Sequence, residues 1–174
     1  PVSAKESAEY RIENNTLNES GPDGETANGS GRSNSFFEEV DATDAELQRV
    51  LKMGKVDGEE VKEFPEIIGN TDVLGDSISE RLLNGATIIL TILEEAHDVS
   101  RIKTTKLKDA LGESGMDIDN WSNVHGQENK DVYLDSRGTG SSGTTAVRAP
   151  GKKDAHGYMQ ALVEDLRAGE EDDE

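Results

Sequence analysis

The segment from Ser77 to His97 constrains the fold of this chain more than any other part of the sequence. It opens with Ser77-x-x-Glu80, the pattern of a capping box, in which two side chains satisfy free backbone N–H groups at the start of a helix. Apolar residues then recur at spacings of three and four: Leu82, Ala86, Ile88, Ile89, Leu90, Ile92 and Leu93. A stripe this wide predicts a helix that is buried in the core of a domain.

The apolar run inside this helix, Ala86–Leu93, is too short to cross a membrane. A membrane span needs about 18 or more consecutive apolar residues, and no stretch of the chain approaches that length. The N-terminus, PVSAKESAEYRIENN, also lacks the apolar core of a signal peptide. We therefore expect a cytoplasmic protein without a membrane partner.

The composition is too polar for a chain that folds from end to end. Hydrophobic residues make up 32% of the 174 residues, and the mean hydropathy is −0.71. Residues 1–34 predict a disordered acidic tail, and residues 168–174, AGEEDDE, predict a second one. Such tails serve solubility or bind a basic protein partner. The chain has no cysteine, which excludes disulfides, thiolate catalysis and zinc ribbons.

The formal net charge of −19 is unevenly distributed. Between Val99 and Gln160, nine Lys and Arg residues oppose eight Asp and Glu residues, so this segment carries +1 and the remainder −20. A large negative charge repels nucleic acid in ordinary buffer. Residues 99–160 lack this negative surplus, so they are the part of the chain that nucleic acid could approach. The acidic surplus with few aromatic residues resembles proteins of salt-accumulating haloarchaea, although an excess of Lys over Arg departs from their usual composition.

Capping signals predict a short helical extension over residues 35–76. Thr43-x-x-Glu46 is a second capping box, which opens a helix through Leu47, Val50 and Leu51. Asp57 can cap another helix, whose apolar residues are Val61, Phe64, Ile67 and Ile68, with Pro65 interrupting it.

Shorter elements follow the central helix. Thr104 or Thr105 can cap a helix that Gly112 and Gly115 end, and Asp117 or Asp119 can cap the next. Residues 131–134 and 144–148 predict two short strands. After Pro150-Gly151, a last amphipathic helix is predicted from its apolar residues: Ala155, Tyr158, Met159, Leu162, Val163 and Leu166.

The loop between the two strands spells Gly138-x-Gly140-x-x-Gly143, the fingerprint of a dinucleotide-binding loop. A real dinucleotide loop lies between a strand and a helix whose N-terminus binds the pyrophosphate. Here the glycines precede TTAVRAP, where Thr and Val favour a strand and Pro150 stops a helix. We interpret the loop as a hairpin turn and expect no cofactor.

The order of helices, strand, glycine-rich loop, strand and closing helix resembles winged-helix domains. In that family a helix-turn-helix precedes a β-hairpin, the wing, which is often basic and often leads through a Pro-Gly turn into a further helix. The resemblance rests on element order and on YLDSRGTGSSGTTAVRAPGKKDA, and it covers residues 77–167. It implies a mainly α fold with a small β-hairpin (α+β) and a DNA-binding or regulatory function. It also implies that two copies of the chain can form a homodimer through the last helix.

The same resemblance implies where DNA would bind. The segment 119–130 would enter the major groove, where Asn, Gln and Ser read base edges. The start of the preceding helix would hold a phosphate, and the wing would carry further cations. The residues implied are Lys103, Thr104, Thr105, Lys106, Asn120, Ser122, Asn123, Gln127, Lys130, Arg137, Arg148, Lys152 and Lys153.

Two features keep an alternative open. The segment 119–130 and its flanks contain Asp117, Asp119, Glu128 and Asp131 but only one cation, Lys130. Many winged helices bind proteins instead of DNA, so the alternative function is a structural or adaptor subunit of a virus particle or multi-protein complex, whose tails become ordered on neighbouring chains. No arrangement of catalytic or metal-ligating residues is evident from spacing, and we expect neither an enzyme nor a metal site.

Overall fold

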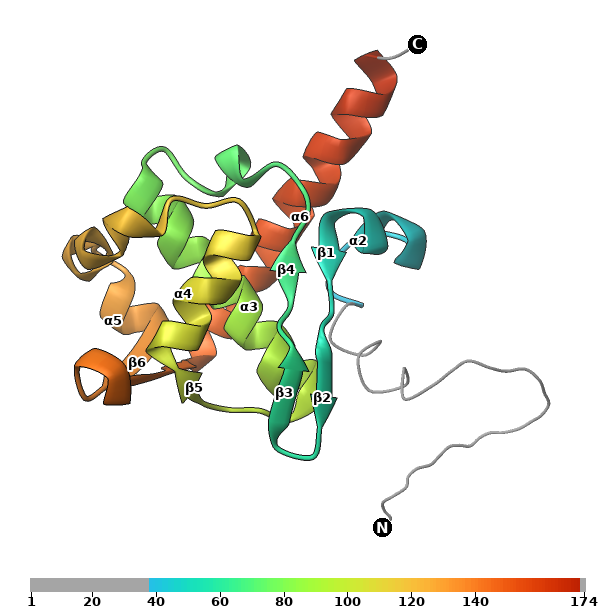
Figure 1. The fold of residues 1–174 in the computed structure, drawn as a ribbon. Coiled ribbons are helices and arrows are strands. Elements are labelled where there is room, and N and C mark those ends of the chain that lie inside the picture. Colours follow the sequence, from blue (N-terminus) through green and yellow to red (C-terminus); the bar gives the residue numbers. More distant parts are fainter. Residues whose placement is uncertain (1–37, 173–174) are drawn as a thin grey trace. The chain divides into compact units, whose positions relative to one another are not determined.

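Helix α3 (Ile78–His97) runs through the middle of the fold, and the other elements surround it (Figure 1). The computed structural model describes residues 38–172, so the tail predicted for residues 1–34 lies outside the described residues. Ser77 caps α3 by accepting a hydrogen bond from the backbone N–H of Glu80 at 3.1 Å. Every residue from Leu82 to Leu93 is buried. The prediction of a capped core helix is confirmed, but the capping box is not reciprocal, because the Glu80 carboxylate accepts from the backbone N–H of Asp76 at 2.9 Å and not from that of Ser77.

The described chain is a mixed α/β fold with small antiparallel sheets. Residues from Val40 onward form one compact unit, in which α6 packs along α3. The remaining elements in chain order are α2 (Asp44–Val50), β1 (Leu51–Lys52), β2 (Lys55–Asp57), β3 (Glu60–Glu63), β4 (Glu66–Ile67), η1 (Thr71–Leu74), β5 (Ile102–Lys103), α4 (Thr104–Glu113), η2 (Ile118–Gly126), α5 (Lys130–Tyr133), β6 (Leu134–Arg137), η3 (Gly140–Ser142), β7 (Thr144–Val147) and α6 (Ala149–Asp172).

The prediction of a helix after Asp57 was wrong, because residues 55–67 contain strands β2, β3 and β4. Strands β2 and β3 form an antiparallel hairpin in which Asp57 lies opposite Glu60. Gly58 begins its two-residue turn with a positive φ of 64°, a conformation that glycine adopts without steric cost. The spacing of Val61, Phe64 and Ile67 by three residues fits a helix and not the alternation of a strand, so the glycine directly after Asp57 was the more informative signal.

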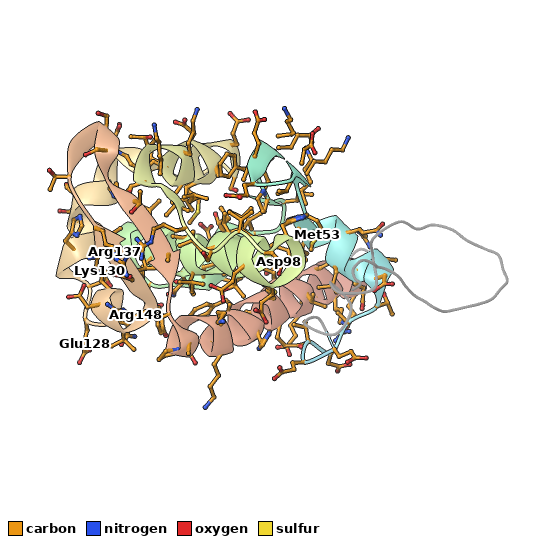
Figure 2. All side chains as sticks on the ribbon, turned by 90° about the horizontal axis from the view of Figure 1, so that it is seen from below. Met53, Asp98, Glu128, Lys130, Arg137 and Arg148 are labelled. Atoms are coloured by element: carbon orange, nitrogen blue, oxygen red, sulfur yellow. The ribbon has the colours of Figure 1, made fainter. Side chains whose placement is uncertain are left out.

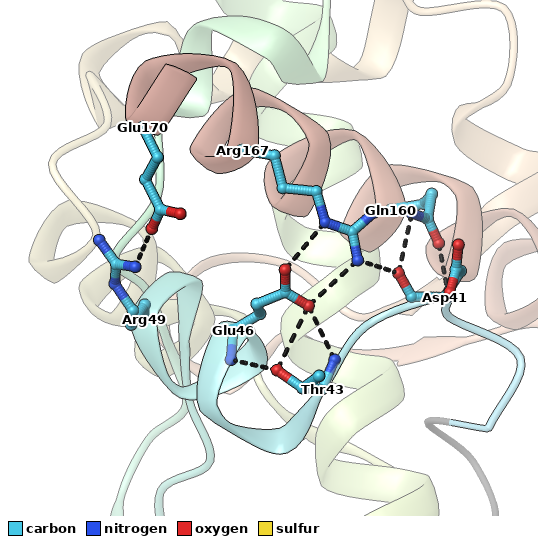
Figure 3. Close-up of polar contacts among 7 residues, drawn as sticks. All are labelled: Asp41, Thr43, Glu46, Arg49, Gln160, Arg167 and Glu170. Carbon is cyan, nitrogen blue, oxygen red and sulfur yellow. Dashed lines mark hydrogen bonds and ion pairs between the residues drawn. The ribbon is translucent and has the colours of Figure 1, made fainter. Parts of the chain in front are cut away.

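The capping box at Thr43 is confirmed, and it fastens α2 to α6 (Figure 3). Arg167 donates to both carboxylate oxygens of Glu46, at 2.8 and 3.1 Å, and to the backbone carbonyl of Asp41 at 2.9 Å. The Gln160 amide accepts from the backbone N–H of Asp41 at 2.6 Å and donates to its carbonyl at 3.2 Å. The start of the compact unit is therefore held to α6 by specific polar contacts.

Helix α6 is longer at both ends than the sequence predicted. It begins at Ala149, because Pro150 fits the first turn of a helix, where its missing N–H has no intrahelical partner. It continues to Asp172, so residues 168–172, predicted to be a disordered tail, are helical. An ion pair between Arg49 and Glu170 joins this last part of α6 to α2.

Candidate nucleic-acid interface

The third sheet carries the candidate site, and its strand order is β5-β7-β6. The predicted β-hairpin is confirmed, since β6 and β7 pair antiparallel across the glycine-rich loop. The placement of the first strand at residues 131–134 was wrong, because residues 131–133 belong to the short helix α5 and the strand begins at Leu134. The residues of β5 also pair with β7, which places the segment before α4 beside the hairpin.

The register of this sheet divides its residues between two faces. Residues directly opposite each other in antiparallel strands point to the same face. The inner face packs on the core through Ile102, Leu134, Thr145 and Val147, all buried, and ends at the exposed Ser136, which lies opposite Thr145. On the outer face, Lys103, Thr144 and Arg137 form one row across the three strands, and Asp135 and Ala146 belong to the next row. Lys103 and Arg137 are exposed.

Three arginines meet at Asp135 on this outer face. Arg101 forms an ion pair with the Asp135 carboxylate and also donates to the backbone carbonyl of Asp135 at 3.2 Å and to Thr144 Oγ1 at 3.1 Å. Arg137 Nη2 lies 2.9 Å from Asp135 Oδ2, and Arg148 Nη2 lies 3.7 Å from Asp135 Oδ1. We call Lys103, Arg101, Arg137, Arg148 and Asp135 the basic face.

The basic face holds four cations and one anion, in a chain whose net charge is −19. Burial opposes ionisation of Asp135, but the hydrogen bond from Arg101 and the charges of Arg137 and Arg101 outweigh it, so the pKa of Asp135 is lowered. The side chains of Arg137 and Arg148 remain 70% and 49% exposed, which leaves guanidinium N–H groups accessible to a ligand. Figure 2 shows both residues at the end of the compact unit far from Met53.

The glycine-rich loop gives the hairpin a turn that only glycine adopts easily. Gly138 and Gly140 have positive φ angles of 75° and 62°. The loop contains the three-residue turn η3, and strand β7 follows it, with no helix at the position where a dinucleotide loop has one. The interpretation of this loop as a hairpin turn is confirmed.

The residues at the start of α4 that were predicted to bind phosphate lie next to this loop, and they differ in how accessible they are to a ligand. The backbone N–H of Thr104 donates to the Gly143 carbonyl at 2.9 Å, and its hydroxyl hydrogen bonds with that of Thr145 at 2.7 Å. Thr104 is thus bound within the protein. Thr105 and Lys106 are exposed and stay available, as does Lys103 on the basic face.

The segment 119–130 is not the α-helix that was predicted. Residues 118–126 form the 3-10 helix η2, in which Asp117 accepts hydrogen bonds from the backbone N–H of Asp119 and from the Asn120 amide. Asn123 donates to Asn120 at 3.3 Å. Asp and Asn side chains that bond the nearby chain compete with regular helix formation, and Gly126 ends the element.

The remaining residues predicted to contact DNA differ in accessibility. Ser122 and Asn123 are exposed, and Gln127 is half-buried. The Lys130 side chain is only 13% exposed and pairs with Asp131 at 3.1 Å, so it presents little charge to solvent. Lys152 is paired with Glu94 and Glu95 of α3, and the hydrogen bond to Glu94 raises its pKa. Lys153 is exposed.

Sequence reasoning missed Arg101 and Asp135 as members of the site. Arg101 is two residues before Lys103, and Asp135 is two residues before Arg137, so alternation along each strand places each pair on one face. That signal was present in the sequence. The meeting of the two pairs depends on the pairing of β5 with β7, which links residues about 40 positions apart and leaves no local trace.

Comparisons with protein-family models, curated proteins and solved structures found no match for this chain. Within residues 38–172, no helix combines the length and apolarity that a membrane crossing requires. The same part of the chain shows no group of three or more His, Asp or Glu residues arranged to hold a metal ion.

Proposed function

We propose that residues 78–172 form a winged-helix domain that binds nucleic acid and acts as a regulator without catalysis. The observation that carries this proposal is the basic face, where three arginines pair with Asp135 and Lys103 lies in the same row as Arg137, in an otherwise acidic protein. Phosphate backbones are bound by such clusters of cations, whose contacts release counterions from the nucleic acid.

The order of elements supports the winged-helix class. Helix α3, strand β5, helix α4 and the short helices η2 and α5 precede the hairpin β6–β7, and α6 closes the series. Helix α4, the turn around Gly115 and η2 correspond to the helix-turn-helix, and the hairpin corresponds to the wing. The sheet that joins β5 to the hairpin holds the wing against the helices.

The distribution of charge favours contact through the hairpin over base reading by η2. Asp117, Asp119, Glu128 and Asp131 flank or occupy that segment and are exposed, whereas Lys130 is largely buried. An acidic helix placed in the major groove would face repulsion from both phosphate strands. We therefore assign the backbone contacts to the basic face and leave a smaller role in groove contact to Ser122 and Asn123.

The test is a fluorescence-anisotropy titration with random-sequence duplex DNA between about 0.1 and 2 M KCl. We expect saturable binding that weakens with salt, because each neutralised phosphate adds about 0.9 to the slope of log K against log salt. Arg137→Glu should weaken binding about ten-fold or more at 0.1 M KCl and reduce the slope by about one. Lys62→Glu is the matched control, since it makes the same charge change on the exposed strand β3.

Absence of binding at every salt concentration would contradict the proposal. Equal loss of affinity in the Arg137 and Lys62 variants would contradict the assignment of the basic face. The first of these results would favour the alternative function, a structural or adaptor subunit that contacts other protein chains.

A further inference from the structure

Asp135 is the carboxylate that the three arginines of the basic face share, and its position is unusual for a residue in a phosphate-binding surface. Its two carboxylate oxygens are shared between arginines from three places in the chain: Oδ2 faces Arg101 and Arg137, and Oδ1 faces Arg148. The Asp135 side chain is only 24% exposed. A nucleic-acid phosphate that approached Arg137 and Arg148 would meet guanidinium groups that already form an ion pair with this carboxylate through one nitrogen each.

Most of the arginine positions do not depend on the Asp135 carboxylate. Arg101 is held by the backbone carbonyl of Asp135 and by Thr144 Oγ1 as well. Arg148 Nε donates to the Leu134 carbonyl at 3.1 Å. These contacts persist if the side chain at position 135 loses its charge. The main effect of the Asp135 carboxylate on this surface is therefore its negative charge, because Arg101 and Arg148 are held in place by other contacts.

We propose that Asp135 acts as an intramolecular competitor of a nucleic-acid phosphodiester for Arg137 and Arg148. This inference rests on the proposed function and adds a residue that sets the strength of the phosphate contact. A guanidinium group presents five N–H donors in a planar fork and binds carboxylate and phosphate oxygens in the same manner. When a phosphodiester binds, Arg137 and Arg148 exchange their ion pairs with Asp135 for contacts with the phosphate oxygens, while Arg101 stays with Asp135 and keeps the carboxylate in place.

Competition of this kind predicts a gain of affinity when the carboxylate is neutralised. Asp135→Asn keeps the size of the side chain and one acceptor oxygen, and Arg101 and Arg148 keep their other hydrogen bonds, while the competing charge disappears. We expect duplex DNA to bind about three- to ten-fold more tightly at 0.1 M KCl, the effect of one or two exposed ion pairs. The gain should vanish near 2 M KCl, because charges are screened within about 3 Å at 1 M salt.

The experiment measures duplex binding by anisotropy for the wild type, Asp135→Asn and Asp57→Asn. Asp57 is exposed at the end of β2, and Asn is as well suited as Asp to a position beside a turn. This control makes the same charge change away from the basic face. We expect a gain for Asp135→Asn alone. An unchanged or weaker affinity for folded Asp135→Asn, or an equal gain in both variants, would overturn the inference.

A second measurement separates this inference from the proposed function. The Arg137 and Arg148 Nε–Hε signals of the full chain are followed by NMR while inorganic phosphate is added, with chloride at equal ionic strength as control. If duplex DNA binds and Asp135→Asn changes neither its affinity nor the phosphate-induced shifts, the inference fails and the proposed function stands. If inorganic phosphate shifts these signals but duplex DNA does not bind, the nucleic-acid assignment fails, and the inference fails with it.

Discussion

The substitution Gly151→Ala tests how closely the start of α6 packs against the hairpin. A Cβ atom built at Gly151 would lie 2.8 Å from the Tyr133 carbonyl oxygen and 2.9 Å from a methyl group of Val147. The Tyr133 carbonyl cannot move aside easily, because it accepts a 2.7 Å hydrogen bond from the backbone N–H of Arg148. Overpacking of a well-packed site costs about 1–3 kcal/mol, which here exceeds the small gain in helix propensity expected in a first turn.

Gly157→Ala is the matched control, because it makes the same substitution in the same helix. Among the described residues, no atom outside the helix's own backbone and the two neighbouring residues lies within 4 Å of a Cβ atom built at Gly157, so the substitution should stabilise the fold by about 0.5–1 kcal/mol through helix propensity alone. The two variants should therefore differ in sign. For a domain of this size 1 kcal/mol corresponds to a change in Tm of about 3–4 °C.

The assay is urea unfolding followed by far-UV circular dichroism and by the fluorescence of Trp121, the single tryptophan, which is buried in the core. We expect a lower midpoint for Gly151→Ala and a higher midpoint for Gly157→Ala, with unchanged slopes. If Gly151→Ala were as stable as Gly157→Ala, α6 would not approach the Tyr133 backbone as the structure has it. That result would also remove the support for the position of the wing.

Three further predictions concern other parts of the compact unit. The hydrogen bond from Arg167 is the main cause that lowers the pKa of Glu46 to about 2. The ionised Glu46 therefore stabilises the fold fully above about pH 4.5, and this stabilisation is lost as the pH falls towards 2. The Tm difference between wild type and Glu46→Gln should shrink over that range, and a constant difference would contradict the prediction. Asn84→Leu should destabilise by about 1–3 kcal/mol in urea unfolding, because the buried Leu74 carbonyl loses its 2.6 Å partner; an unchanged midpoint would show that another donor replaces the amide. Leu107→Ala should cost about 2–5 kcal/mol in the same assay, since its side chain is fully buried, and a cost near that of an exposed residue would refute its place in the core.

Local signals in the sequence predicted those elements whose causes lie within a few residues. The caps at Ser77 and Thr43 and the glycine-rich turn depend on hydrogen bonds and φ angles of adjacent residues, and the structure has all three. Where two local signals conflicted, the prediction failed. After Asp57, the helical spacing of apolar residues led to the prediction of a helix, whereas the turn that begins at Gly58 joins two strands. After Arg167, the acidic composition led to the prediction of disorder, whereas α6 continues there and Glu170 pairs with Arg49.

The sequence by itself determined the core helix, the hairpin and the one segment that is free of the acidic surplus. Only the tertiary structure decided which cations are accessible together. Arg101 and Asp135 meet because β5 pairs with β7, while Lys152 turns to Glu94, 58 residues away. Charge is a property of composition, but the free charge of a surface depends on which side chains neutralise each other. Those pairings follow from packing between distant segments, which no local pattern encodes.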